Sequence, residues 1–158
     1  MDIHLMAALG KAGAAAALGL AAIGSSVGTG VAGMAAIGAW KKCYMQSKSA
    51  PFILITFIGA PLSQTIYGMI LMNVIVGKCN EALAGGEHAF VNWPGMLAAG
   101  IFGGIAMAAS AIYQGKAGAA GADSLAETGQ GFGNYLMTIG VVETVALFVM
   151  VFVQATLS

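Results

Sequence analysis

The chain has 158 residues, of which 59% are hydrophobic and only 8% are charged, against about 25% charged residues in a typical soluble domain. Six lysines balance six acidic residues, so the net charge is 0 and no basic face for a nucleic acid can be built. Two cysteines are too few for a secreted disulfide scaffold. With a mean hydropathy of +0.88, the composition predicts an integral membrane protein made almost entirely of membrane spans.

Four apolar segments are each long enough to cross a bilayer, which takes about 20 residues of helix. In chain order they cover about 5–39, 51–76, 94–122 and 131–153. They cannot be core helices of a soluble domain, because too few polar residues remain to cover four of them. The sequence therefore predicts an all-α membrane protein with four spans. Pro61 lies inside the second span, where we expect it to kink the helix.

The loops predict how the chain is oriented in the cell membrane. The loop at 40–50 holds three lysines, whereas the loop at 77–93 holds one lysine and two acids. Because lysine prefers the cytoplasmic side, we expect loops 40–50 and 123–130 in the cytoplasm and both termini outside. Cys43 and Cys79 then lie on opposite sides of the membrane and cannot pair within one chain.

The two halves of the chain are similar, which indicates one helical hairpin used twice, about 1–77 and about 94–158. The aligned segments are 25–33 with 110–118, and 63–66 with 142–145. The first and third spans carry most glycines, and small residues four apart let membrane helices approach closely. Composition fits two arrangements: these two helices in an inner layer with the bulkier two outside, or ordinary tight packing in a monomeric bundle. Residues 28–33 fit the pattern G-x-G-x-x-G, but no strand precedes them, so a dinucleotide site is excluded.

Glu143 is the one acid deep in an apolar span, near the middle of the fourth. A lone carboxylate there costs at least about 2.5–3.5 kcal/mol, so it must be protonated, paired or bound to a cation. Ser63, Gln64 and Tyr67 in the second span and Gln114 in the third lie near the same depth. Glu143 is therefore the candidate functional residue, and these four side chains are its candidate partners.

The candidate partners offer only oxygen ligands, which suit a hard cation. The carbonyl of Ala60, next to Pro61, adds another oxygen. One carboxylate neutralises a monovalent ion, whereas a divalent ion would leave a net charge in lipid. Sodium is therefore the first expectation for the cargo. A proton is the alternative, although it needs only the carboxylate and one or two hydrogen-bonding partners.

Four spans in a duplicated hairpin, with one acid in the last span, resemble the rotor-ring proteolipid of V-type and A-type ATPases. The resemblance is nearest to the sodium-translocating K subunit of bacterial V-type ATPases. The segments that carry it are 61–68 in the second span, 113–116 in the third and 140–144 in the fourth. Two departures are Ser63, where threonine is usual, and Ala60, where a larger residue is usual.

The resemblance implies a role for each candidate residue. Glu143 would carry the ion, and Tyr67 would hydrogen-bond to it and hold it closed. The sodium ligands would be the Ala60 carbonyl, Ser63 Oγ, Gln64 Oε1, Gln114 Oε1 and Glu143.

The resemblance also implies an assembly and its partners. The chain would form a closed homo-oligomeric ring in the lipid bilayer, against a stator a/I subunit that bears an arginine. Central-stalk subunits would link the ring to ATP hydrolysis on other chains, so this chain would not itself be an enzyme. The alternatives are the same rotor carrying protons, or a small channel or transporter. Transporter sites typically use inverted repeats, whereas this repeat is parallel.

Overall fold

The computed structural model describes residues 1–85 and 90–157, and this part of the chain contains helices and no strand. The elements are α1 (Ile3–Met45), η1 (Phe52–Leu54), α2 (Ile55–Gly59), η2 (Ala60–Leu62), α3 (Ser63–Ala84), α4 (Trp93–Thr128) and α5 (Phe132–Ala155). Four stretches are long and apolar enough to cross a membrane: Ile3–Met45, Phe52–Ala84, Trp93–Thr128 and Phe132–Ala155. The expected all-α fold with four spans is thereby confirmed. Glu87, in the loop at 77–93, lies outside the described residues.

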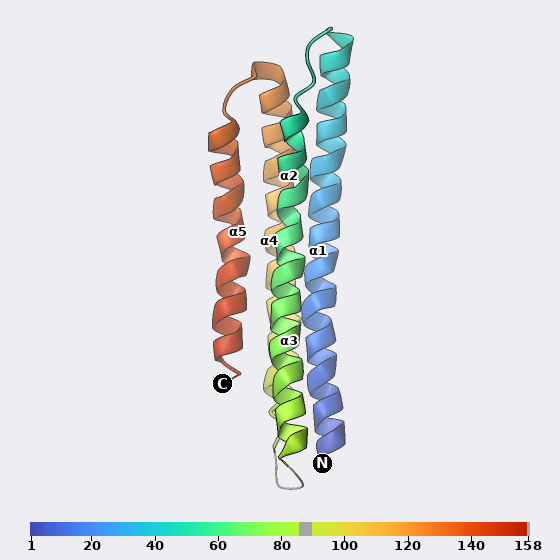
Figure 1. Cartoon of the computed structure of the whole chain (residues 1–158), viewed down its shortest axis with the longest axis vertical. Helices are drawn as coiled ribbons and strands as arrows, with labels where there is room; N and C mark the ends of the chain where they lie inside the picture. Colours follow the sequence, from blue (N-terminus) through green and yellow to red (C-terminus); the bar gives the residue numbers. More distant parts are fainter. Residues whose placement is uncertain (86–89, 158) are drawn as a thin grey trace.

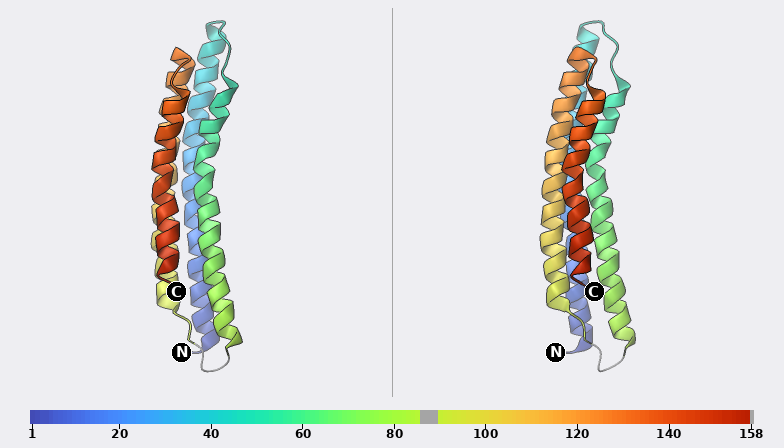
Figure 2. Two further views of the ribbon diagram at one scale, coloured as in Figure 1. Left: turned by 60° about the vertical axis from the view of Figure 1, so that its left-hand side comes forward. Right: turned by 90° about the vertical axis from the view of Figure 1, so that its left-hand side faces the viewer.

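The helices form an elongated bundle of two hairpins (Figure 1). Both termini lie at one end, and the connections after α1 and after α4 lie at the other. Figure 2 shows that α1 and α4 run side by side, with α3 and α5 packed against them. The loops at 40–50 and 123–130 therefore share one end of the molecule, as the alternation of spans predicts. Cys43 and Cys79 are both free thiols.

Helix α1 runs past the end of the expected span, through Lys41 and Lys42 to Met45. A helix of 43 residues is about 64 Å long, about twice the thickness of the hydrocarbon core of a bilayer. Only about half of this length is needed to cross the hydrocarbon core, so the charged side chains in the last turns need not lie among lipid tails. The helix stops only where Ser47 takes a positive φ of 54°.

The second span changes helix type at Pro61. Proline has no N–H to donate, and here the chain forms the 3-10 turn η2 between α2 and α3. The α-helix resumes at Ser63. The effect of Pro61 is a local tightening of the helix over Ala60–Leu62, directly before the polar residues of α3.

Glycines allow α1 and α4 to touch along their backbones. A Cβ atom on Gly115 would collide with the backbone of Gly28, and one on Gly100 would collide with the backbone of Gly13. Contact this close requires both partners to lack a side chain. The glycine-rich helices therefore pair with each other, while α5 exposes bulky side chains such as Val141, Phe148 and Phe152.

A polar layer separates two apolar clusters of the bundle. The cluster toward the termini includes Leu71, Ile75 and Met107, and the cluster toward the loops includes Phe57 and Ile139. The side chains of Gln64 and Gln114 lie between them on α3 and α4 and are completely buried. Buried amides at this depth need hydrogen-bond partners, because lipid supplies none.

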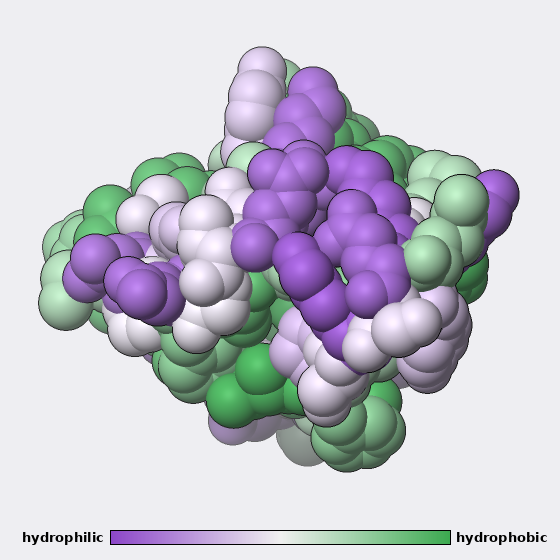
Figure 3. Space-filling view, turned by 90° about the horizontal axis from the view of Figure 1, so that it is seen from above, coloured by the Kyte–Doolittle hydropathy of each residue, from purple (hydrophilic) through white to green (hydrophobic). Residues whose placement is uncertain are grey.

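The loop end of the bundle is polar (Figure 3). Its exposed side chains include Lys41, Lys42, Lys48, Asp123, Glu127 and Gln130. Lys42 Nζ lies 2.9 Å from Asp123 Oδ1 and 3.3 Å from Glu127 Oε1. These exposed ion pairs link the end of α1 to the end of α4, and each contributes little to stability because water screens it.

Candidate ion-binding site

The carboxylate of Glu143, on α5, faces α3 and α4. It is half-buried, and it sits near the middle of α5. In the described part of the chain, the ion pairs are those of Lys42, so no basic side chain is paired with Glu143. The charge of this carboxylate must therefore be met by hydrogen bonds, by a proton or by a bound cation.

Two side chains donate hydrogen bonds to the carboxylate, one to each oxygen. The hydroxyl of Tyr67 on α3 donates to Glu143 Oε1 over 2.7 Å. The amide Nε2 of Gln114 on α4 donates to Glu143 Oε2 over 3.2 Å and to the Ile139 carbonyl over 3.3 Å. Each of the three helices around the site thus supplies one of these three side chains.

A second row of contacts lies behind the carboxylate. Gln64 Nε2 donates to Gln114 Oε1 over 2.8 Å and lies 3.4 Å from Ser110 Oγ. Ser110 Oγ in turn donates to the Val142 carbonyl over 2.9 Å. These bonds tie α3, α4 and α5 together at the depth of Glu143 and fix the orientation of both glutamines.

Three oxygens gather where η2 meets α3. Ser63 Oγ lies 3.1 Å from the Ala60 carbonyl oxygen and 3.2 Å from Gln64 Oε1. The single hydroxyl proton of Ser63 can serve either acceptor. The turn at Pro61 brings the Ala60 carbonyl to this position, since it precedes the first turn of α3 directly.

The structure brings all six sequence-predicted residues into one continuous network. From Ala60 the contacts pass through Ser63, Gln64 and Gln114 to Glu143, and Tyr67 closes the other side of the carboxylate. The residues come from η2, α3, α4 and α5, so the site exists only in the folded pair of hairpins. The network supplies carboxylate, amide, hydroxyl and carbonyl oxygens and one negative charge.

Sequence reasoning missed Ser110 as a site residue. It is buried, with 5% of its surface exposed, and it contacts both Gln64 and the backbone of α5. Its position four residues before Gln114 was an available signal, because residues four apart share one face of a helix.

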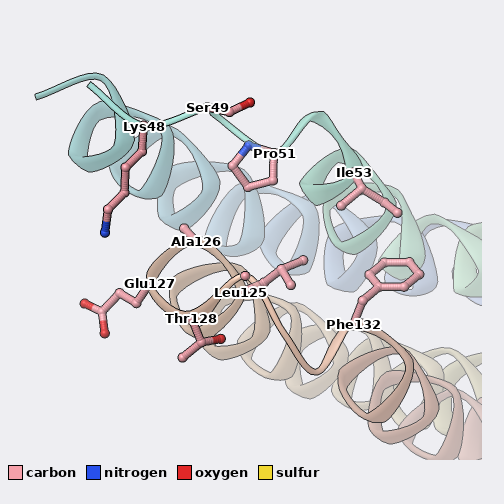
Figure 4. A pocket seen from close by; sticks show the side chains of 10 residues that line it. Lys48, Ser49, Pro51, Ile53, Leu125, Ala126, Glu127, Thr128 and Phe132 are labelled. Carbon is pink, nitrogen blue, oxygen red and sulfur yellow. The ribbon is translucent and has the colours of Figure 1, made fainter. Parts of the chain in front are cut away.

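A separate groove of about 580 Å³ lies at the loop end. Figure 4 shows its lining: Lys48 and Pro51 lie on the segment that follows α1, Glu127 at the end of α4 and Phe132 at the start of α5. The lining mixes charged, polar and apolar side chains. This groove does not include Glu143 or any residue of the network, and it belongs to the polar end of the bundle.

One comparison with known families gives a match. Residues 97–153, which cover most of α4 and α5, match the model of the ATP synthase C-subunit family. The second hairpin is therefore similar to the hairpin of this family. Its members are non-catalytic rotor proteolipids of ATPase complexes and assemble into oligomeric rings. The match includes Ser110, Gln114 and Glu143 and leaves the first hairpin outside. No curated protein matches the chain by sequence.

Proposed function

We propose that this chain is one protomer of a membrane rotor ring of a V-type ATPase and that it carries one Na⁺ on Glu143. The family match of the second hairpin supports the rotor role. The observation that carries the choice of ion is the oxygen-rich network around Glu143, which extends over three helices. A proton would need only Glu143 and one or two partners, whereas this network supplies enough oxygens to replace the water shell of a cation.

The two buried glutamines are central to this proposal. As the side chains lie, Gln64 points its Nε2 at Gln114 Oε1. The two ends of a side-chain amide have the same shape, so half a turn of the Gln64 amide would set its Oε1 opposite Gln114 Oε1. Two amide oxygens repel each other unless a cation lies between them. We infer that the ion displaces this amide–amide hydrogen bond when it binds, together with the Ala60 carbonyl, Ser63 Oγ and Glu143.

A proton is the second candidate, and one observation favours it. The network around Glu143 is already closed by hydrogen bonds from Tyr67 and Gln114. A protonated carboxylic acid could join such a network, because the Tyr67 hydroxyl can accept as well as donate. In that case the glutamines would be structural, and sodium would have no effect on the state of Glu143.

The proposed cycle follows from the cost of a charge in lipid. While the protomer faces lipid, Glu143 must stay loaded, because a bare carboxylate there is too unfavourable. Where the ring meets the stator a/I subunit, an arginine on that subunit would compensate the carboxylate and release the ion. Moving one charge across 100 mV corresponds to about 2.3 kcal/mol, which ATP hydrolysis on other subunits supplies.

We infer that the loops at 40–50 and 123–130 face the cytoplasm and that both termini lie outside. The excess of lysines in the first of these loops supports this orientation. The polar end formed by these loops, with the groove beside Lys48, would face the central-stalk subunits.

The test is the rate at which a hydrophobic carbodiimide modifies Glu143 in the purified ring. Carbodiimides attack the protonated acid, so bound Na⁺ should slow the modification, while KCl at equal ionic strength should not. Glu143→Gln serves as the control that removes the reactive group, and it should also abolish coupled transport in the assembled ATPase. Equal rates in NaCl and KCl would favour the proton, and transport by the Glu143→Gln variant would exclude Glu143 as the carrier.

A further inference from the structure

The internal repeat gives paired positions on the two inner helices, α1 and α4, that differ by 85 in number. Some of these positions are buried in one repeat and exposed in the other. On α4, Gly100, Gly104 and Gly115 are buried against α1. Their equivalents on α1 are Ala15, Gly19 and Gly30, and all three are exposed. Small residues therefore line an uncovered face of α1 that corresponds to the covered face of α4.

The glycines of α1 show the converse pattern, since they are buried and their equivalents on α4 are exposed. On α1, Gly13, Gly24 and Gly28 are buried against α4. Their equivalents on α4 are Ala98, Ala109 and Tyr113, and all three are exposed. Other pairs do not differ in this way: Ser25 and its equivalent Ser110 are both buried. The mismatched glycines of each helix are the ones that touch the other helix of the α1–α4 pair, and their exposed equivalents mark a face of the same shape that nothing covers in a single copy.

We propose that the α4 face formed by Ala98, Ala109 and Tyr113 packs on the α1 face formed by Ala15, Gly19 and Gly30 of the next copy of the chain. This proposal rests on the ring proposed above and specifies its interface. The α1–α4 contact inside one copy has a parallel course and glycine on both sides. If the same contact is repeated between copies, the uncovered α4 face of each copy packs on the uncovered α1 face of the next. In a closed ring, both faces are then covered in every copy.

The register of the internal contact fixes which residues meet. Inside one copy, Gly28 touches Ala111 and Gly115. Replacing each of these residues by its equivalent in the other repeat, 85 positions away, places Tyr113 over Ser26 and Gly30 of the next copy. A Cβ atom on Gly30 would meet nothing within 4 Å, so this surface has room for an aromatic ring. The same rule brings Ala98 against Ala15, the equivalents of Gly13 and Gly100.

The two kinds of contact are chemically unequal. The contact within a copy joins glycine to glycine, whereas the contact between copies joins Tyr113 to Gly30. Tyr113 is 62% exposed in the single copy, and Lys116 Nζ lies 4.8 Å from the centre of its ring. We therefore expect the inner helices to be spaced more widely between copies than within a copy, with the tyrosine ring filling the difference.

This interface would also cover the open side of the ion site. A groove of about 520 Å³ lies between α4 and α5 on the face of Tyr113. It is lined by Ala106, Ala109, Ser110, Tyr113, Val141, Val142 and Val145. Ser110 and Val142 also belong to the contacts around Glu143. The first hairpin of the next copy would fill this groove and exclude water from that side of the site.

The test is disulfide formation between separate chains. In a background with Cys43→Ala and Cys79→Ala, Gly30→Cys and Tyr113→Cys are placed on different copies and co-expressed. After oxidation, we expect a dimer band that neither variant gives alone. Ala15→Cys with Ala98→Cys provides a second pair that does not depend on Tyr113. Gly30→Cys with Phe148→Cys is the control, because Phe148 lies on the outward surface of α5 and should not react.

A substitution gives a second measurement. Gly30→Leu should fill the surface that receives Tyr113 and reduce the yield of intact rings in mild detergent at least severalfold. Gly59→Leu is the matched control, because Gly59 is exposed with nothing within 4 Å of its Cβ position, and its equivalent in the second hairpin, Thr138, is exposed as well.

The outcomes separate this inference from the proposed function. Rings that assemble and show sodium protection of Glu143, yet form neither disulfide, would overturn the interface and leave the function standing. Disulfides at both pairs without sodium protection would support the interface and count against the sodium assignment. An unchanged yield of intact rings in the Gly30→Leu variant would likewise contradict the packing of Tyr113 on Gly30 of the next copy.

Discussion

The hydroxyl of Tyr67 and the carboxylate of Glu143 meet through a 2.7 Å hydrogen bond that joins α3 to α5. Tyr67 lies one turn after Ser63 on α3, and Glu143 lies at the middle of α5. The bond holds the carboxylate oxygen that the Gln114 amide does not contact. It also couples the two hairpins at the depth where the candidate ion site lies.

Tyr67→Phe should weaken sodium binding without preventing assembly. The variant keeps the aromatic side chain but loses its hydroxyl, and with it the hydrogen bond to Glu143 Oε1. A hydrogen bond to a charged group contributes about 1.5–3 kcal/mol, so the apparent affinity should fall by about tenfold or more. The measurement is the sodium concentration that halves the rate of carbodiimide labelling. Tyr44→Phe is a matched control, because Tyr44 is 70% exposed at the end of α1. An unchanged half-point in Tyr67→Phe would show that this bond does not hold the loaded state.

Gln114→Leu should impair both stability and ion binding. The substitution removes the donor to Glu143 Oε2 and leaves the buried Nε2 of Gln64 without its 2.8 Å acceptor. Gln64 Nε2 then keeps only its longer 3.4 Å contact with Ser110 Oγ. A weakly paired buried amide costs up to about 1–3 kcal/mol, which a lower midpoint of thermal unfolding should report. Sodium protection of Glu143 should be lost as well. Gln130→Leu, at the exposed third loop, should change neither value, and sodium protection that survives in Gln114→Leu would remove Gln114 from the ligand set.

Sequence reasoning could place the candidate site because polar residues in an apolar span have few places to go. Glu143, Gln64 and Gln114 each interrupt a long hydrophobic stretch, and lipid cannot satisfy any of them. They had to converge inside the bundle. The identity of the hydrogen-bond donors was not accessible in the same way, because it depends on side-chain rotation. Ser110 was missed because serine is common in membrane helices, so only its place four residues before Gln114 pointed to the site.

The ends of the helices were harder to predict than the spans themselves. The lysines at 41 and 42 ended the expected first span, yet α1 continues to Met45. Charge limits how far a helix stays in lipid, but it does not break the backbone hydrogen bonds. The stop comes from the local backbone at Ser47, and such a turn has no strong signature when the residue is serine rather than glycine.

Gly115→Ala should destabilise the protomer by overpacking. A Cβ atom at this position would collide with the backbone of Gly28, which cannot move aside as a flexible side chain could. Overpacking of this kind costs about 1–3 kcal/mol, so the unfolding midpoint in detergent should fall. Gly140→Ala on α5 is the control, since nothing lies within 4 Å of its Cβ position, and it should leave the midpoint unchanged or raise it. Equal midpoints for the two variants would mean that α1 and α4 do not touch as described.

Sodium binding should weaken as the pH falls, because Na⁺ and a proton compete for the same carboxylate. Where Glu143 is protonated before the ion binds, each ion must release one proton. The sodium concentration that halves carbodiimide labelling should then rise about tenfold for each unit by which the pH is lowered.

The pH series also distinguishes competition from an indirect effect of sodium. If Na⁺ acted at the polar loop end, through Lys42 and its acidic partners, the half-point would respond to ionic strength rather than to protons. Replacing NaCl by choline chloride at constant ionic strength separates the two cases. A half-point that stays constant from acidic to alkaline pH would contradict direct ligation of the ion by Glu143, even if sodium still slowed the labelling.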